Sequence, residues 1–141
     1  MRHRRFRIWA SARPKPARRW RRLKLKWAFG FPDGSSAYGQ PSIVGGRVFV
    51  GADTGYVYSL DAKTGCVHWS FQGKAGVRNA MSVAMVGGKA IVFFGDLKAN
   101  AYALDARTGE QAWTNHVEDN FTDRVTAAPA VYGGRVFVPI S

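Results

Sequence analysis

The sequence predicts an all-β chain made of four-stranded antiparallel β-propeller blades, of which about two and a half are present. Three sets of markers recur with a common period of about 44 residues. They are tryptophans, Gly-Gly pairs before a basic residue, and Leu-Asp-Ala-(Lys/Arg)-Thr-Gly segments. Their members are Trp27, Trp69 and Trp113; Gly45-Gly46-Arg47, Gly87-Gly88-Lys89 and Gly133-Gly134-Arg135; and residues 60–65 and 104–109. A repeat of this length is typical of propeller blades.

Within one period, short apolar strands alternate with turn signals. Paired glycines supply the positive φ angles that tight hairpins need, so Gly45-Gly46 is expected to join two strands. Asp53-Thr54-Gly55 and residues 61–65 mark two further turns. Four strands therefore fit into residues 38–72. The segment lacks the 10–15-residue helical patterns that a βαβ solenoid requires.

The same pattern sets the expected limits of each unit. Residues 1–24 form a leader, and residues 25–141 form the partial propeller. Its expected parts are an outer strand at 24–29, blades at 38–72 and 79–117, and the start of a further blade at 125–141. Closing the ring protects strand edges in a propeller, so an open set of blades is expected to associate with the remaining blades or with itself.

The positive charge of the chain is concentrated at its N-terminus. Residues 1–26 hold twelve of the 21 Lys and Arg residues and no acidic residue, which leaves residues 27–141 neutral. We expect a disordered, solvated arm, and nucleic-acid binding is not expected because no recognition motif accompanies the charge. The leader lacks the apolar core of a signal peptide, and no run of 18 apolar residues predicts a transmembrane helix.

The residues that bind metals most often are sparse. Cys66, the single cysteine, and His68 would share one face of a strand. Two ligands without a third do not make a metal site, so no metal is assigned to this chain. Asp96 precedes a turn and is expected to bond its own backbone rather than to act as a catalytic base.

The Leu-Asp-Ala segments and the tryptophans that follow them resemble the tryptophan-docking repeat of pyrroloquinoline quinone (PQQ) dehydrogenases, Ala-x-Asp-x-x-Thr-Gly-x-x-x-Trp. Ala103 holds the first position in one copy, and Ser59 replaces it in the other. In that family the tryptophan docks against the next blade, where its large ring buries apolar area. The resemblance assigns this structural role to Trp27, Asp61, Thr64, Gly65, Trp69, Asp105, Thr108, Gly109 and Trp113.

Residues 75–80, 92–97 and 124–129 resemble the polyvinyl-alcohol-dehydrogenase-like quinohaemoproteins. The resemblance covers residues 25–141. It implies an eight-bladed periplasmic or secreted propeller that holds PQQ near its axis, with a calcium ion and an aspartate base for alcohol oxidation. No Cys-x-x-Cys-His haem motif occurs in this chain, and neither the aspartate nor a calcium-ligand set matches a position. No catalytic residue is assigned, and the chain alone is expected to be inactive.

The loops that enter the innermost strands are expected to lie nearest the propeller axis. Because guanidinium groups bind carboxylates bidentately, a quinone with three carboxylates favours arginine partners. Arg78 and Arg124 lie 46 residues apart, which predicts equivalent points of two blades. Together with Asn79 and Thr126 they are the predicted PQQ contacts. The alternative is that the arginines pair with local carboxylates such as Asp119.

Two functions are compatible with the sequence. One is a part of a quinoprotein alcohol dehydrogenase that acts on a small or polymeric alcohol. The other is a non-catalytic propeller scaffold for protein–protein interaction, similar to outer-membrane assembly factors. The motifs of residues 75–80 and 124–129 favour the first. Whether the chain belongs to an enzyme is left undecided, because the fold alone does not fix the function.

Overall fold

The computed structural model describes residues 23–32, 34, 36–120 and 122–141, and all of the regular elements in these ranges are β-strands. Nearly all of the basic leader lies outside the described residues. The strands form two four-stranded sheets and one two-stranded sheet. In each sheet, strands that follow one another in sequence are neighbours and pair antiparallel, as expected for propeller blades.

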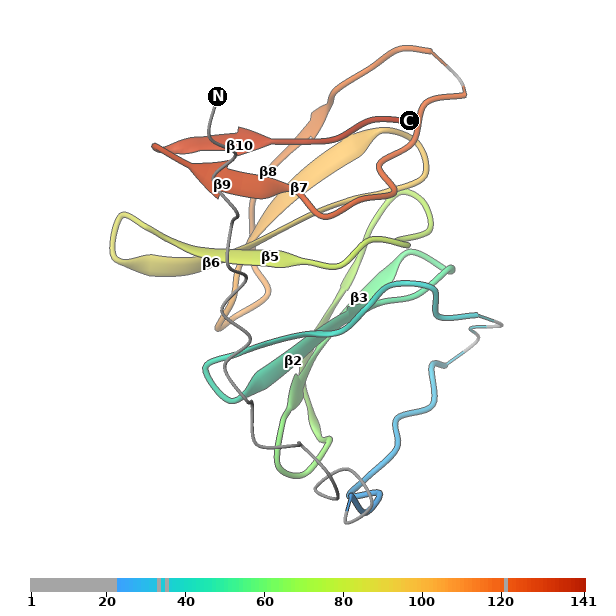
Figure 1. Cartoon of the computed structure of the whole chain (residues 1–141), viewed down its shortest axis with the longest axis vertical. Helices are drawn as coiled ribbons and strands as arrows, with labels where there is room; N and C mark the ends of the chain where they lie inside the picture. Colours follow the sequence, from blue (N-terminus) through green and yellow to red (C-terminus); the bar gives the residue numbers. More distant parts are fainter. Residues whose placement is uncertain (1–22, 33, 35, 121) are drawn as a thin grey trace, which may run out of the picture.

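Blade 1 contains β1 (Ser42–Val44), β2 (Arg47–Gly51), β3 (Tyr56–Asp61) and β4 (Val67–Gln72). Blade 2 contains β5 (Ser82–Val86), β6 (Lys89–Gly95), β7 (Asn100–Asp105) and β8 (Gln111–His116). The third sheet has β9 (Ala130–Tyr132) and β10 (Arg135–Phe137). Figure 1 shows the three sheets following one another along the molecule.

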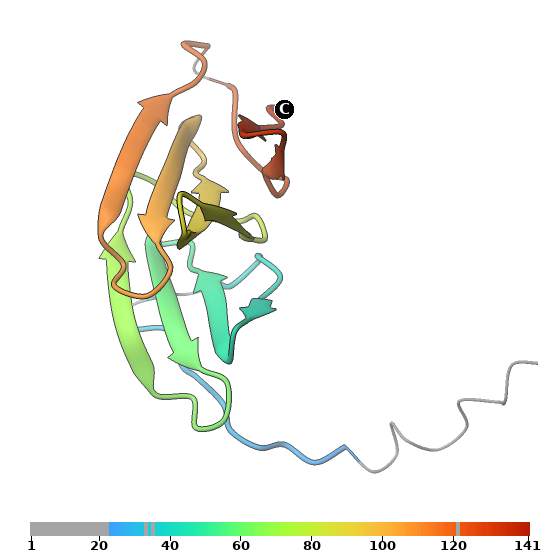
Figure 2. The same ribbon diagram turned by 90° about the vertical axis from the view of Figure 1, so that its left-hand side faces the viewer.

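The sheets are arranged like neighbouring blades of a fan. Figure 2 shows β4 and β8 along one side of the molecule and the short strands β1, β5 and β9 along the other. Residues 24–29 were expected to form an outer strand, but they carry no strand assignment. A strand requires backbone hydrogen bonds to a neighbour, and the described residues provide no neighbour for this segment.

The turns form at the positions that the sequence predicts. The three Gly-Gly pairs all adopt positive φ, for example 58° and 77° at Gly45 and Gly46, which confirms the predicted hairpins. In the β3–β4 turn, an Asp61 carboxylate oxygen accepts hydrogen bonds from the backbone N–H groups of Lys63 and Thr64 at 2.9 and 2.8 Å. Asp105 repeats this arrangement in blade 2. These bonds hold the pKa of both carboxyl groups below its ordinary value.

Apolar side chains from both blades fill the space between them. Phe49, Val57 and Trp69 of blade 1 pack with Val92, Phe94, Tyr102 and Leu104 of blade 2 in one buried cluster. The aromatic rings interlock: those of Phe94 and Tyr102 stack with centroids 4.9 Å apart. Burial of this apolar area is the main force that joins the two blades.

Each of the first two repeat tryptophans lies against the following blade. The indole N–H of Trp69 donates to the Ala106 carbonyl at 3.1 Å, and a Cβ on Gly109 would lie 2.6 Å from the indole ring. Trp27 repeats the contact one blade earlier, with its indole N–H 3.2 Å from the Ala62 carbonyl. Only glycine leaves room for the ring, and its positive φ also suits the turn.

The third repeat tryptophan has a different environment. Trp113 is half-buried and contacts Phe93 of its own blade, with ring centroids 6.0 Å apart. The third sheet places Val131 and Val136 against the same face of blade 2. Large apolar side chains remain exposed on β9 and β10, including Tyr132 at 81% and Phe137 at 53%. This sheet therefore presents an open apolar surface.

Candidate functional site

Two loops lead into the innermost strands: residues 73–81 enter β5, and residues 117–129 enter β9. Both loops are held by the same backbone contact to the preceding sheet. The Val77 N–H donates to the Ala52 carbonyl at 2.9 Å, and the Val125 N–H donates to the Asp96 carbonyl at 3.0 Å. Both valines are fully buried. They rest on Gly51 and Gly95, where an added Cβ would lie within about 2.5 Å of the valine side chain.

This contact corrects the predicted equivalence of Arg78 and Arg124. Since Val77 and Val125 occupy the same position, Arg78 corresponds to Thr126, whereas Arg124 lies one residue before the anchoring valine. The second loop carries four more residues before its valine, and the stretch from this valine to the next Gly-Gly pair is two residues shorter. The insertion and the deletion partly cancel, so the spacing of 46 concealed a shift of the register.

The same register extends backward by one blade. The Asp53 N–H donates to the Ser36 carbonyl at 3.3 Å, and the Leu97 N–H donates to the Gly76 carbonyl at 3.0 Å. Ser36 and Gly76 are therefore equivalent, and so are Tyr38 and Arg78, two residues later. Tyr38, Arg78 and Thr126 form a row across three successive loops, which we call the loop row. From the sequence, Tyr38, Arg78 and Thr126 were already expected at comparable positions of successive blades, and the structure now fixes the register among them.

The loop row combines an aromatic face, a cation and a hydroxyl group. All three side chains are exposed. The guanidinium carbon of Arg78 lies 4.4 Å from the centroid of the Tyr38 ring, within the range of a cation–π interaction. The hydroxyls of Thr126 and Ser141 share a hydrogen bond of 2.9 Å. Such a row can bind a planar anion, because the ring offers a stacking surface and the guanidinium offers paired donors.

Asn79, the next residue, has a structural position. Its side chain is 2% exposed, and its amide nitrogen donates to the carbonyls of Gly95 at 2.7 Å and Val125 at 2.9 Å. Both amide hydrogens are thus used to tie loop 73–81 to β6 and to the following loop. A direct contact between Asn79 and a ligand was predicted, but its buried amide instead fixes the backbone that carries Arg78.

Arg124 lies at the edge of the row. Its backbone N–H and carbonyl both bond to Ser141, at 3.0 and 3.1 Å, and its side chain is exposed. Among the described residues, neither Arg78 nor Arg124 forms an ion pair with a carboxylate. Asp119, the partner considered from the sequence, instead lies 3.5 Å from the imidazole of His116. Both guanidinium groups are therefore available to another anion.

A buried polar network supports the β6–β7 turn. Asp96 is fully buried, and its carboxylate accepts bonds from the Lys98 and Asn100 backbone, the Asn100 amide and the Tyr102 hydroxyl. The Tyr102 oxygen in turn accepts the Lys74 N–H at 3.0 Å. Burial, together with the Asp96 carboxylate, raises the pKa of the Tyr102 hydroxyl far above its ordinary value. The network confirms Asp96 as a turn residue; its buried partners were not expected from the sequence.

The remaining candidates give no metal site within the described ranges. These residues contain no group of three or more His, Cys, Asp or Glu side chains close enough to hold an ion. Cys66 is exposed, and His68 lies 3.8 Å from the Asp61 carboxylate. The described part of the chain also has no helix suited to crossing a membrane.

The repeat, the glycine-docked tryptophans and the stacked blades agree with a comparison to known families. A model of the PQQ-repeat type, described as outer membrane protein assembly factor BamB, matches residues 24–139. The chain belongs to this PQQ-repeat family. It is 42% identical to a polyvinylalcohol dehydrogenase of a Pseudomonas species and 39% identical to that of Sphingopyxis sp. strain 113P3, in each case over 85% of this chain. The chain spans about a fifth of these relatives, since it covers 19% of each.

Solved structures agree on the fold of this PQQ-repeat chain. A europium-containing methanol dehydrogenase superposes with a TM-score of 0.69 at 26% identity, covering 87% of this chain and 23% of that protein. BamB from Moraxella catarrhalis superposes with a TM-score of 0.65 at 22% identity, covering 82% of this chain and 33% of that one. The second likeness supports the propeller fold alone. The chain is therefore a partial propeller similar to quinoprotein alcohol dehydrogenases.

Proposed function

We propose that this chain supplies blades to a PQQ-dependent alcohol dehydrogenase of the periplasm or the cell exterior. The observation that carries the proposal is the 42% identity to a polyvinylalcohol dehydrogenase over 85% of the chain. The loop row adds physical support, because it gathers an aromatic ring and an unpaired guanidinium beside the innermost strands. PQQ, when bound, would supply the two-electron acceptor that converts an alcohol to a carbonyl compound.

The chain's own residues fit one part of such a site. Arg78 would hold a carboxylate of the quinone through paired N–H donors while its other face stays on the Tyr38 ring. Thr126 would offer its hydroxyl from the next loop, and Arg124 would add positive charge at the edge of the row. Asn79 would position Arg78 without touching the cofactor. The proposal assigns no catalytic base and no metal ligand to this chain.

The substrate of the intact protein would be a secondary alcohol, because poly(vinyl alcohol) is a chain of secondary hydroxyl groups. The proposed role of this segment is to hold the cofactor, and the isolated chain is expected to be inactive because a ligand near the axis needs contacts from several blades.

The test is PQQ binding and alcohol oxidation by the intact protein that contains these residues. We expect Arg78→Ala to weaken PQQ binding by about tenfold or more, as loss of a charge-assisted bidentate pair should. Thr126→Val should have a smaller effect. Arg135→Ala, in β10, is the matched control because its side chain is also an exposed arginine. Unchanged PQQ affinity of the Arg78 variant would remove this residue from the site.

A non-catalytic scaffold is the second candidate, favoured by the BamB description of the family model. It predicts that the intact protein binds no PQQ and oxidises no alcohol. Saturable PQQ binding that depends on Arg78 would decide for the dehydrogenase. Absence of both binding and oxidation would decide for the scaffold.

A further inference from the structure

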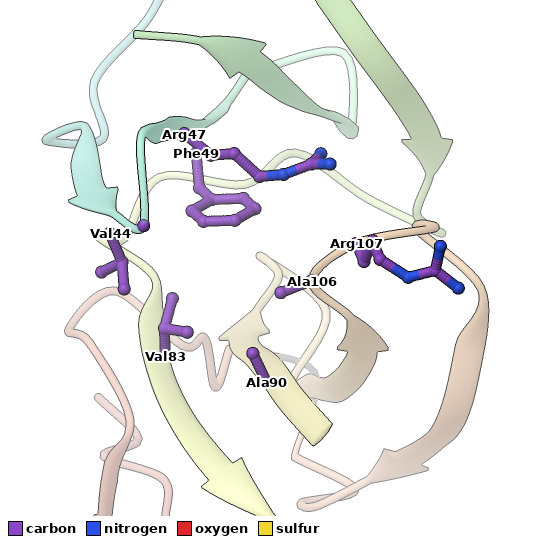
Figure 3. A pocket seen from close by; sticks show the side chains of 8 residues that line it. Val44, Arg47, Phe49, Val83, Ala90, Ala106 and Arg107 are labelled. Atoms are coloured by element: carbon purple, nitrogen blue, oxygen red, sulfur yellow. The ribbon is translucent and has the colours of Figure 1, made fainter. Parts of the chain in front are cut away.

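A second candidate binding site lies away from the loop row, in the interface between the blades. A cavity of about 160 Å3 opens between blade 1 and blade 2. Its lining includes Phe49 from β2 and Val83, Ala90 and Ala106 from blade 2. Figure 3 shows the Arg47 side chain running past the Phe49 ring, with Arg107 on the turn at the far side of the cavity. A cavity of about this size accommodates a molecule as large as benzene.

Arg47 is half-buried, and its guanidinium donates to the Ser59 hydroxyl at 3.1 Å. Among the described residues it forms no ion pair with a carboxylate. Asp61 lies opposite Arg47 in the strand pairing, but one of its carboxylate oxygens accepts bonds from the backbone of the β3–β4 turn and the other lies 3.8 Å from the His68 imidazole. Arg107 is exposed and interacts electrostatically with Asp105. A partly buried cation without a counter-ion is unfavourable, and an anion in the cavity would offset that cost.

A basic residue follows each Gly-Gly pair, but β6 is two residues longer than β2, so Lys89 does not take the position of Arg47 beside the neighbouring strand. Strand pairing makes Ile91 of blade 2 the equivalent of Arg47, and Ala103 the equivalent of Ser59. Blade 2 thus has an apolar pair where blade 1 has a hydrogen-bonded polar pair. The same structural position is satisfied by apolar side chains, so Arg47 and Ser59 are a specific addition to blade 1 beside the cavity.

We propose that this cavity binds a small aliphatic carboxylate, with the carboxylate on Arg47 and the alkyl chain against Phe49, Val83, Ala90 and Ala106. The charge of Arg47 selects an anion, and its planar donor fork suits a carboxylate. The apolar lining selects a short hydrocarbon chain of about four carbons, given the cavity volume. This site is separate from the loop row and does not depend on PQQ binding.

The experiment is calorimetric titration of the full chain with butanoate. Butanamide has the same shape without the charge, and inorganic phosphate has charge without the alkyl chain. We expect saturable butanoate binding, with both other ligands weaker by about tenfold or more. The double variant Arg47→Ile/Ser59→Ala copies blade 2 at both positions, so it should keep the far-UV circular dichroism spectrum and lose the binding.

Two further variants sharpen the outcome. Arg47→Lys keeps the charge without the planar fork and should bind butanoate with intermediate affinity. Arg135→Gln removes an exposed arginine elsewhere and should bind as the wild type does. The proposal is overturned if the wild-type chain shows no saturable butanoate binding, if the double variant retains it, or if butanamide or phosphate binds equally well.

Discussion

The two complete blades share one backbone plan but stabilise the same turn differently. In blade 1 the turn between β2 and β3 contains Ala52 and Gly55, and Gly55 has a φ of 90°. In blade 2 the equivalent residues are Asp96 and Ala99, and Ala99 keeps a positive φ of 53° without being glycine. The blade 1 turn is stabilised by a glycine with a positive φ and by stacked aromatic rings, whereas the blade 2 turn is stabilised by hydrogen bonds to a buried carboxylate. A repeat therefore fixes the shape of a turn more strictly than its chemistry.

Removal of the buried carboxylate should have the largest effect. Asp96→Ala leaves the Tyr102 hydroxyl and the Asn100 amide without their acceptor in a site that excludes water. We expect the free energy of unfolding to fall by about 3–5 kcal/mol. Urea unfolding followed by circular dichroism measures this change, with Ala52→Ser in blade 1 as a control for substitution at the equivalent position.

The triple variant Asp96→Ala/Ala99→Gly/Asn100→Tyr gives the blade 2 turn the residues found at the equivalent positions of blade 1. In blade 1 the Tyr56 and Tyr58 rings stack with centroids 5.8 Å apart. The transferred tyrosine should stack on Tyr102 in the same way and restore at least half of the stability lost in Asp96→Ala. A triple variant no more stable than the single variant would show that the two turns are not interchangeable.

Substitution of Gly109 or Gly65, the glycines against which Trp69 and Trp27 pack, should cause the next largest losses of stability. Gly109→Ala drives a Cβ to 2.6 Å from the buried Trp69 ring and strains a φ of 77°, so we expect a loss of about 2–4 kcal/mol. Gly65→Ala meets the half-buried Trp27 ring at 2.8 Å. That ring can shift, so the loss should be smaller. Equal losses in urea unfolding would contradict the difference in burial of the two tryptophans.

Substitutions at Gly55 and Ala99, the equivalent residues with positive φ, should change stability less, and by different amounts. In Gly55→Ala the new Cβ would lie 2.9 Å from the Ala75 carbonyl oxygen, which predicts a loss of about 1–3 kcal/mol. Ala99→Gly relieves backbone strain but loses a buried methyl group, so its stability should stay within about 0.5 kcal/mol of the wild type. Thermal unfolding of both variants checks this, and a large loss in Ala99→Gly would show that the methyl contact dominates.

The turn aspartates should have the smallest effect, visible only in acid. Hydrogen bonds in the folded chain lower the pKa of Asp61 and Asp105. Their contribution is therefore present above the pKa of the unfolded chain and is lost as the pH falls through the lower folded value, below about pH 4. Asp61→Asn/Asp105→Asn should flatten the decline of the urea midpoint between pH 4 and pH 2. An unchanged decline would assign acid unfolding to other carboxyl groups.

The periodic part of the fold could be predicted from the sequence. Tryptophan spacing, Gly-Gly pairs and the Asp-Thr-Gly turns are local signals that repeat at fixed positions, so the strands could be placed from them. The loops were harder, because four additional residues between Trp113 and Val125 shifted Arg124 out of register with Arg78, and a deletion of two residues between Val125 and Gly133 partly concealed the shift. The partners of the Asn79 amide and the contact of Asp96 with the Tyr102 hydroxyl could not be predicted, since these groups lie on other strands and loops with no local signal.

The central claim is that the tryptophan–glycine contact joins two blades into one cooperative unit. Native-state hydrogen exchange of amides in β3 and β7, in the full chain and in Trp69→Ala, tests it most directly. We predict equal opening free energies in the two strands of the wild type, and a fall of about 3–5 kcal/mol in both strands of the variant. Unequal wild-type values, or a loss confined to β3, would show that the blades open independently and would contradict the account.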